Sequence, residues 1–78
     1  MQAPVGTRMR RIRRDQDLTQ EALATLAGLN VITVSRLENG TAKEVYADTV
    51  AALAKALKIS ADYLLGLTEK AEKLKDVV

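Results

Sequence analysis

The stretch from Thr19 to Gly40, TQEALATLAGLNVITVSRLENG, decides the fold that this sequence predicts. Thr19 is a suitable N-cap for a short helix, and Glu21 lies in its first turn, near the positive end of the helix dipole. Gly28 ends that helix because glycine adopts a positive φ without strain, and Asn30 then caps a second helix that ends at Gly40. The stretch therefore predicts two short helices joined by a tight turn.

Helical periodicity extends in both directions from this pair. One helix is expected from Thr7 to about Gln16, with Asp17 in the turn that follows, because aspartate tolerates the left-handed conformation. After a loop at residues 41–47, a further helix is expected to carry apolar residues at i, i+3, i+4 and i+7. These residues are Val50, Leu53, Ala54 and Leu57.

The C-terminal part predicts one short helix and a possible sixth one. Ser60 is a suitable N-cap for the sequence ADYLL, and a glycine ends that helix. Thr68 is a possible cap for the sixth helix. No strand is required, so the expected fold class is all-α. The expected organisation is a flexible tail at 1–5, a five-helix domain at 6–66 and a helical extension at 67–78.

The composition excludes several kinds of functional site. The chain has 78 residues, 47% of them hydrophobic, which suits one small domain with an aliphatic core. It has no Cys and no His, which excludes disulfides, thiolate catalysis, histidine base chemistry and the usual zinc sites. No glycine-rich phosphate loop or nucleophile–base pair is visible, so we expect neither an enzyme nor a cofactor or metal. No membrane span or signal peptide is visible, and a reducing cytoplasm is the simplest location.

Positive charge is concentrated near the N-terminus, although the net charge is only +2. Five arginines precede the first acidic residue, Asp15; they are Arg8, Arg10, Arg11, Arg13 and Arg14. Such a run is usually a solvated helix face, and the alternative is attraction toward a polyanion. By itself the run favours the solvated face.

The second helix of the central pair, here named the recognition helix, has a face directed away from the core. With Val34 on the core side, steps of 100° per residue put Ile32 and Arg36 directly outward. The other outward or flanking positions are Thr33, Ser35 and Asn39, with Val31 at the edge of the core face. The spacing of the pair fits a helix-turn-helix, which lays its second helix in the major groove of DNA. We therefore expect the outward face to contact base edges.

Five pieces of the sequence together resemble a known family. They are LTQEALA (18–24), GLN (28–30), SRLENG (35–40), LAKALKIS (53–60) and DYLLG (62–66), in that order. Through them the segment from Gly6 to Gly66, about four fifths of the chain, is similar to the Cro-like, xenobiotic-response-element type of helix-turn-helix found in phage repressors. The resemblance implies five helices, DNA binding as a dimer and control of transcription.

The resemblance implies base contacts at positions 31, 32 and 36. Arg36 is expected to donate two hydrogen bonds to guanine, and Ile32 with Val31 to pack on thymine methyl groups. Thr33 and Ser35 complete the expected base-contacting set. The alternative for Arg36 is a surface arginine paired with an acid. The alternative for Ile32 is a lone exposed apolar residue, or a contact to another protein.

Phosphate contacts are expected around the recognition helix, from Gln20, Asn30, Asn39, Thr41 and Lys43. The N-terminus of the preceding helix presents free N–H groups and a positive dipole, which suit a phosphate, and the resemblance assigns that role to Gln20. The others lie at the N-cap of the recognition helix or after its end, where the DNA backbone is expected to pass. Arg8 and Arg11 are less suited, because the first helix usually lies behind the motif in this family.

The resemblance also places Arg13 against Glu38 as an inward ion pair, and Glu38 falls close to the core side of the helical wheel. We interpret this structural ion pair as a clamp that orients the recognition helix, not as a catalytic acid.

The sequence departs from the family pattern at Asp17, where glycine is frequent. It also departs in the loop at 41–47, which lacks the common Pro-Ser entry to the next helix.

Two functions are compatible with these features. The first is a sequence-specific, double-stranded DNA-binding transcriptional regulator, most simply a repressor that acts as a homodimer on a palindromic operator. The residues expected at the dimer interface are Leu65, Leu67, Leu74 and Val78, unless the last helix folds back on its own core. The second is an antitoxin or bridging protein whose main partner is another protein, with DNA binding secondary. Val31 and Ile32 would then belong to the protein-contact surface.

Overall fold

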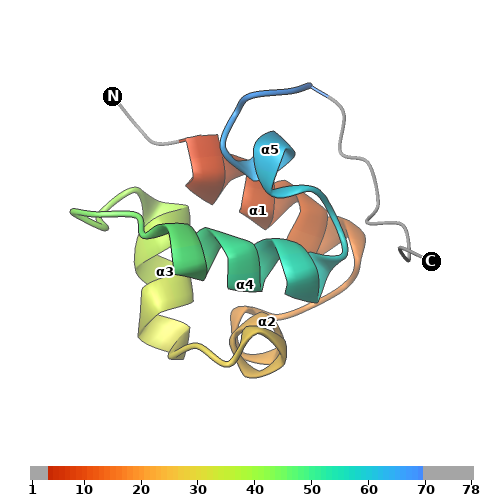
Figure 1. The fold of residues 1–78 in the computed structure, drawn as a ribbon. Helices are drawn as coiled ribbons and strands as arrows, with labels where there is room; N and C mark the ends of the chain where they lie inside the picture. Colours follow the sequence, from red (N-terminus) through yellow and green to blue (C-terminus); the bar gives the residue numbers. More distant parts are fainter. Residues whose placement is uncertain (1–3, 70–78) are drawn as a thin grey trace.

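Five α-helices and no strand make up residues 4–69, the part of the chain that the computed structural model describes (Figure 1). The helices are α1 (Pro4–Asp15), α2 (Gln20–Ala27), α3 (Val31–Asn39), α4 (Ala47–Leu57) and α5 (Ala61–Leu64). The all-α class and the five-helix architecture predicted from the sequence are confirmed. The possible sixth helix, with Leu74 and Val78, lies outside the described residues. Within residues 4–69, no helix is both long and apolar enough to cross a lipid bilayer.

Helix α1 begins earlier than the sequence predicted. Its first residue is Pro4 instead of Thr7, and Val5 is only 3% exposed. Proline is tolerated in the first turn of a helix because the N–H that it lacks would have no partner inside the helix. Val5, which we expected at the end of a flexible tail, therefore belongs to the core, and the predicted tail at 1–5 is wrong at that residue. At the other end of α1, Asp17 has a φ of 56°, as its residue type predicted.

The caps predicted from the sequence are present at the ends of α2, α3 and α5. The side chains of Thr19, Asn30 and Ser60 each accept a hydrogen bond from a backbone N–H of the first turn, at 3.0, 2.8 and 3.2 Å. Gly28 and Gly40 end α2 and α3 in the left-handed conformation, with φ of 69° and 75°. Local sequence signals therefore set the boundaries of both central helices.

The core lies between α4 and the other helices. Helix α4 crosses the middle of the molecule and packs against α2 on one side and α5 on the other, with α1 also in contact (Figure 1). The buried apolar residues are Val5, Met9, Leu23, Ala24, Val34, Leu37, Val50, Leu53, Ala54, Leu57, Ile59, Tyr63 and Leu64. Since aliphatic side chains dominate this set, the helices pack closely.

A close approach between α1 and α3 occurs at Gly6. A Cβ added to Gly6 would lie 2.0 Å from the carbonyl oxygen of Leu37, far inside van der Waals contact. Only glycine fits between the two backbones here, so α1 lies directly against the second half of α3. No local sequence pattern predicted this contact, which holds the recognition helix against the rest of the domain.

Candidate nucleic-acid interface

Helix α3 is half buried and half exposed. Val34 and Leu37 are buried between α3 and its neighbours, while Ile32 is 53% exposed and Val31 is 37% exposed. This division follows the helical wheel, because positions 34 and 37 lie on one face and position 32 on the other. Val31, which the wheel put at the edge of the core face, is at the border of the exposed surface. The exposed half is the candidate surface for DNA.

Arg36 projects from the exposed half of α3 without a partner in the described part of the chain. Its side chain is exposed and makes no hydrogen bond or ion pair within residues 4–69. The surface ion pair that was the alternative for this arginine is therefore not formed there. Thr33 and Ser35 flank it and are partly exposed. The five predicted base-contacting residues thus lie on one helix, with a free guanidinium among them.

A groove runs along α3, between this helix, the loop that follows it and the start of α4. Its lining includes Thr33 and Arg36 from α3 and Thr41 and Lys43 from the loop. Two predicted base-contacting residues and two predicted phosphate-contacting residues therefore face one hollow. Tyr46 also lines it, and its hydroxyl donates a hydrogen bond to the Glu44 carboxylate, which raises the pKa of Tyr46. The sequence carried no signal for this pair.

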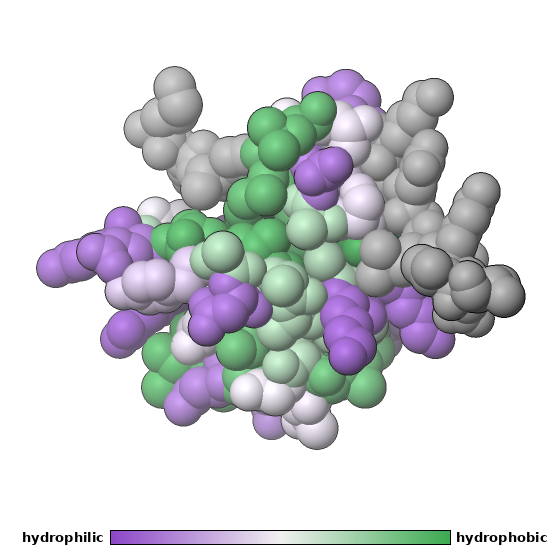
Figure 2. All heavy atoms as spheres, in the orientation of Figure 1, coloured by the Kyte–Doolittle hydropathy of each residue, from purple (hydrophilic) through white to green (hydrophobic). Residues whose placement is uncertain are grey.

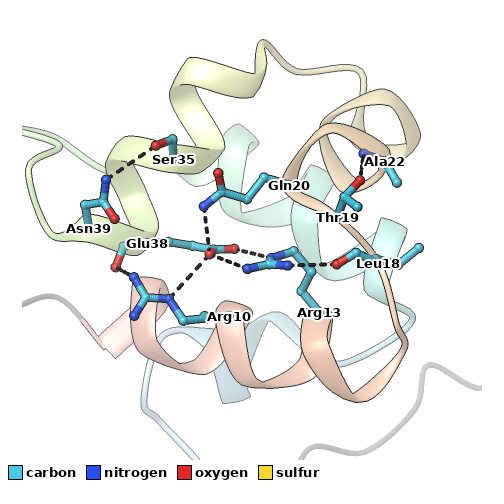
Figure 3. A network of polar contacts seen from close by, with 9 residues as sticks. All are labelled: Arg10, Arg13, Leu18, Thr19, Gln20, Ala22, Ser35, Glu38 and Asn39. Carbon is cyan, nitrogen blue, oxygen red and sulfur yellow. Dashed lines mark hydrogen bonds and ion pairs between the residues drawn. The ribbon is translucent and has the colours of Figure 1, made fainter.

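The remaining phosphate candidates are attached to the ends of the two central helices. Asn30 uses its Oδ1 atom for the N-cap of α3 and is exposed. Asn39 is exposed, and its Nδ2 donates to the Ser35 hydroxyl at 3.4 Å (Figure 3). Gln20 is half-buried and donates from Nε2 to the Glu38 carboxylate at 3.1 Å (Figure 3). Gln20 is thus held toward the inside of the domain, which the sequence did not indicate.

Glu38 is the centre of a polar network that joins α1, α2 and α3 (Figure 3). Its side chain is 0% exposed, and Arg13 donates to both carboxylate oxygens, at 2.7 Å from Nε and 2.9 Å from Nη2. The ion pair expected from the resemblance is therefore present. Arg10 adds a longer contact from Nε at 3.4 Å and a hydrogen bond of 2.6 Å from Nη2 to the Glu38 carbonyl. Arg13 also donates from Nη1 to the Leu18 carbonyl at 2.7 Å, which fixes the α1–α2 turn.

The network keeps the Glu38 carboxylate ionised despite its burial. Burial by itself raises the pKa of Glu38, but hydrogen bonds from Arg13, Gln20 and Arg10, with the charge of Arg13, outweigh it and hold that pKa below the usual range. The same hydrogen bond to Glu38 raises the pKa of Arg13. No buried side-chain nitrogen or oxygen of the described residues lacks a partner. The buried pair is thus fully satisfied, which a buried charge requires.

Comparison with known proteins identifies the architecture. The helix-turn-helix family model matches residues 9–64. The chain belongs to the helix-turn-helix family. The solved structure of the restriction-modification controller protein C.AhdI from Aeromonas hydrophila has a TM-score of 0.74 and 35% identity, over 80% of this chain and 92% of that one. The P22 c2 repressor, solved with a synthetic operator, has a TM-score of 0.71 and 33% identity, over 78% and 91%.

A curated relative agrees with the structural neighbours. The HTH-type transcriptional repressor RghR of Bacillus subtilis (strain 168) is 36% identical over 72 residues, covering 92% of this chain and 51% of that protein. The chain spans about half the length of the curated relatives that it matches. The names of all these relatives describe regulators, controllers or repressors.

The first helix of this helix-turn-helix domain also reaches the C-terminal segment, through Arg8. Its Nη1 donates to the carbonyl oxygens of Tyr63 at 3.0 Å and Thr68 at 2.8 Å, and its Nη2 contacts the Glu69 carboxylate at 3.1 Å. The guanidinium lies 4.6 Å from the centre of the Tyr63 ring, a cation–π distance. Arg8 is therefore a structural residue. The sequence favoured a solvated face for the arginine run, but Arg8 of this run is committed to contacts within the domain.

Apolar side chains are exposed close in sequence to the residues that Arg8 contacts. Leu65 is 44% exposed and Leu67 is 74% exposed, and strongly apolar residues gather over α5 and the segment after it (Figure 2). These are the two predicted dimer-interface residues that the structure describes. Single exposed leucines are common on protein surfaces, whereas two within three residues are candidates for one contact surface.

Proposed function

We propose that this protein is a sequence-specific, double-stranded DNA-binding transcriptional regulator that represses by occupying a palindromic operator as a homodimer. The observation that carries the proposal is the exposed half of α3, where Arg36 has no partner among residues 4–69. The opposite half is anchored to the core and to the Glu38 network. A rigid helix with a free guanidinium on its outer face suits the major groove. The names of its relatives support the same conclusion.

The proposed base readers divide by chemistry. Arg36 donates to the O6 and N7 atoms of a guanine, and Ile32 with Val31 packs on thymine methyl groups. Thr33 and Ser35 flank these contacts and are able to donate hydrogen bonds to bases. The arrangement favours half-sites that contain a guanine close to one or more thymines.

The proposed phosphate contacts surround the recognition helix. Gln20 and Asn30 lie at the N-terminal ends of α2 and α3, and Asn39, Thr41 and Lys43 follow at the end of α3 and in the next loop. Contacts of this kind fix the register of the protein on the duplex and carry no sequence information themselves.

The proposed homodimer suits the geometry of duplex DNA. One domain covers one half-site, and two copies one helical turn apart read a palindrome. We assign the dimer interface to the exposed Leu65 and Leu67, continued by Leu74 and Val78 outside the described residues. Since a regulator of this kind acts on chromosomal DNA, we place it in the cytoplasm.

A protein-partner function is the second candidate, as an antitoxin or bridging protein with secondary DNA binding. It is favoured by three exposed apolar residues near the α2–α3 turn: Leu26 at 61%, Ile32 at 53% and Val31 at 37%. Exposed apolar side chains of this kind are suited to a protein contact. Capture of a defined protein partner in a stable complex, with weak DNA binding by the purified chain, would favour this candidate.

Selection of binding sites from a random duplex-DNA pool tests the first candidate directly. The full chain is expected to enrich a two-fold symmetric site whose half-sites are about 10 base pairs apart. Arg36→Ala is expected to relax selection at one base pair of each half-site. Failure to enrich any sequence would overturn the proposal and favour the protein-partner function.

A further inference from the structure

The Glu38 network places two arginines, Arg10 and Arg13, against a single carboxylate. Arg13 donates to both oxygens of the carboxylate, at 2.7 and 2.9 Å, and this pair is electrically balanced. Arg10 lies beside the same carboxylate, but its Nε is 3.4 Å from the nearer oxygen. The three side chains therefore carry a net charge of about +1, and the surplus resides on Arg10.

The surplus charge is accessible from outside. The side chain of Arg10 is 36% exposed, compared with 11% for Arg13 and 0% for Glu38. Its Nη2 donates to the Glu38 carbonyl at 2.6 Å, which holds the guanidinium at the C-terminal end of α3. Its Nη1 donates to none of residues 4–69, so it is free to bind an added acceptor.

Arg10 also lies among residues expected to contact phosphate. Figure 3 shows its guanidinium next to the end of α3, where Asn39 is attached, and on the same side of Glu38 as that residue. Gln20 approaches the same carboxylate from the N-terminus of α2. A DNA backbone that passes the ends of these two helices would meet Arg10 as a fixed, charged donor whose Nη1 amino group is free to hydrogen-bond a phosphate oxygen.

We propose that Arg10 is a further phosphate-contacting residue of the DNA interface, held in place by Glu38. This inference rests on the proposed DNA-binding function. The other arginines of α1 differ from it in one respect each. Arg8 is committed to the C-terminal segment, and Arg13 is buried. Arg11 and Arg14 are exposed and have no contact within the described part of the chain that orients them.

The salt dependence of DNA binding by the full chain tests the proposal. Affinity for a random-sequence duplex of about 20 base pairs is measured at several salt concentrations, and the slope of log affinity against log salt is compared. Arg10→Gln is expected to reduce this slope by about 0.9 per bound protomer, because one phosphate contact is lost. Arg10→Lys is expected to keep most of the slope, and Arg11→Gln, the matched loss of one charge from α1, to change it little.

Three outcomes would contradict a phosphate contact by Arg10, each for a different reason. A wild-type slope for Arg10→Gln, together with a lowered melting temperature, would mean that Arg10 only supports the fold. Equal slope losses for Arg10→Gln and Arg11→Gln would mean a general field effect without a contact. Absence of duplex binding by the wild-type chain would instead overturn the proposed function.

A measurement on the unmutated chain does not depend on the folding of any variant. The NMR signal of the Arg10 Nε–H is expected to shift when the random-sequence duplex is added, by more than the Arg11 Nε–H signal. A constant Arg10 signal, while the Asn39 side-chain amide shifts, would overturn the proposal and leave the rest of the interface in place.

Discussion

The helix-turn-helix pair and the segment that follows α4 are held in place in opposite ways. Between Thr19 and Gly40, each helix boundary has a capping side chain or a glycine with positive φ within a few residues. In the later segment, Arg8 donates to carbonyl oxygens 55 and 60 residues further along the chain. The helix-turn-helix pair is thus defined mainly by short-range signals, whereas the candidate dimer surface depends on a long-range one.

Glu38 is the point at which the locally defined pair depends on α1. We expect Glu38→Ala to lower the free energy of unfolding by about 3–5 kcal/mol, because Arg13 is left almost buried without its counter-charge. Arg36→Ala, on the exposed face of the same helix, is expected to change it by less than about 0.5 kcal/mol. Urea unfolding followed by circular dichroism measures both. Equal midpoints would show that Glu38 is not the clamp.

Gly6→Ala is the next largest test, because it breaks the α1–α3 contact without removing a charge. The added Cβ would lie 2.0 Å from the Leu37 carbonyl, so the helices must separate, at an expected cost of about 1–3 kcal/mol. Thr7→Ala, at the exposed neighbouring position, is the control and should change stability little. A stable Gly6→Ala variant would mean that α1 is free to shift along α3.

Arg8→Gln tests the long-range half of the comparison. Loss of the charged hydrogen bonds and of the contact with the Tyr63 ring is expected to cost about 1–2 kcal/mol of stability. If Arg8 positions the leucines of the dimer surface, the dissociation constant of the dimer should also rise, by roughly tenfold. Sedimentation equilibrium measures it, with Arg11→Gln as the control. An unchanged dissociation constant would assign the dimer surface elsewhere.

Substitutions at the C-terminal ends of two helices are expected to change stability by smaller amounts and with opposite signs. Gly28 has no neighbouring atom within 4 Å of an added Cβ, so Gly28→Ala costs only backbone strain at φ 69°, about 1 kcal/mol. Helix α4 ends at Lys58, which is not glycine but has a φ of 60°. Lys58→Gly is therefore expected to stabilise the fold by up to about 1 kcal/mol. Thermal unfolding of both variants checks the signs; a destabilised Lys58→Gly would contradict this explanation.

The pH dependence of stability is the smallest expected effect, because it is confined to acid pH. Because the folded pKa of Glu38 is lowered, its contribution to stability is fully present above the unfolded value of about 4.3. That contribution is lost as the pH falls below this value and through the lower folded pKa. We expect the Glu38→Gln variant to lose less stability than wild type over this acid range, measured by urea unfolding at successive pH values. Parallel losses in the two proteins would assign acid sensitivity to other carboxylates.

Much of the candidate interface was predictable because a helix has a fixed period. Stepping from Val34 put Ile32 and Arg36 outward, and the structure has both exposed. The positive φ of Asp17 also followed from its residue type. The pairing of Arg13 with Glu38 required the family resemblance, since the two residues are 25 positions apart and no local pattern joins them.

Other features were not predictable from local patterns. The close contact at Gly6 depends on how two helices cross, and a glycine near the start of a helix gives no sign of this. The turn of Gln20 toward Glu38 depends on the spacing between α2 and α3. In each case a side chain or backbone meets a partner that only packing brings near.

The sequence by itself determined where α2 and α3 begin and end and which face of α3 is exposed, because caps, glycines and helical period act over a few residues. The tertiary structure decided the roles of the arginines in α1. Arg8 fastens the C-terminal segment, Arg13 neutralises Glu38, and Arg10 keeps an accessible charge at the end of the recognition helix. These side chains are chemically identical, and their roles differ because each meets a different helix end or segment when the helices pack.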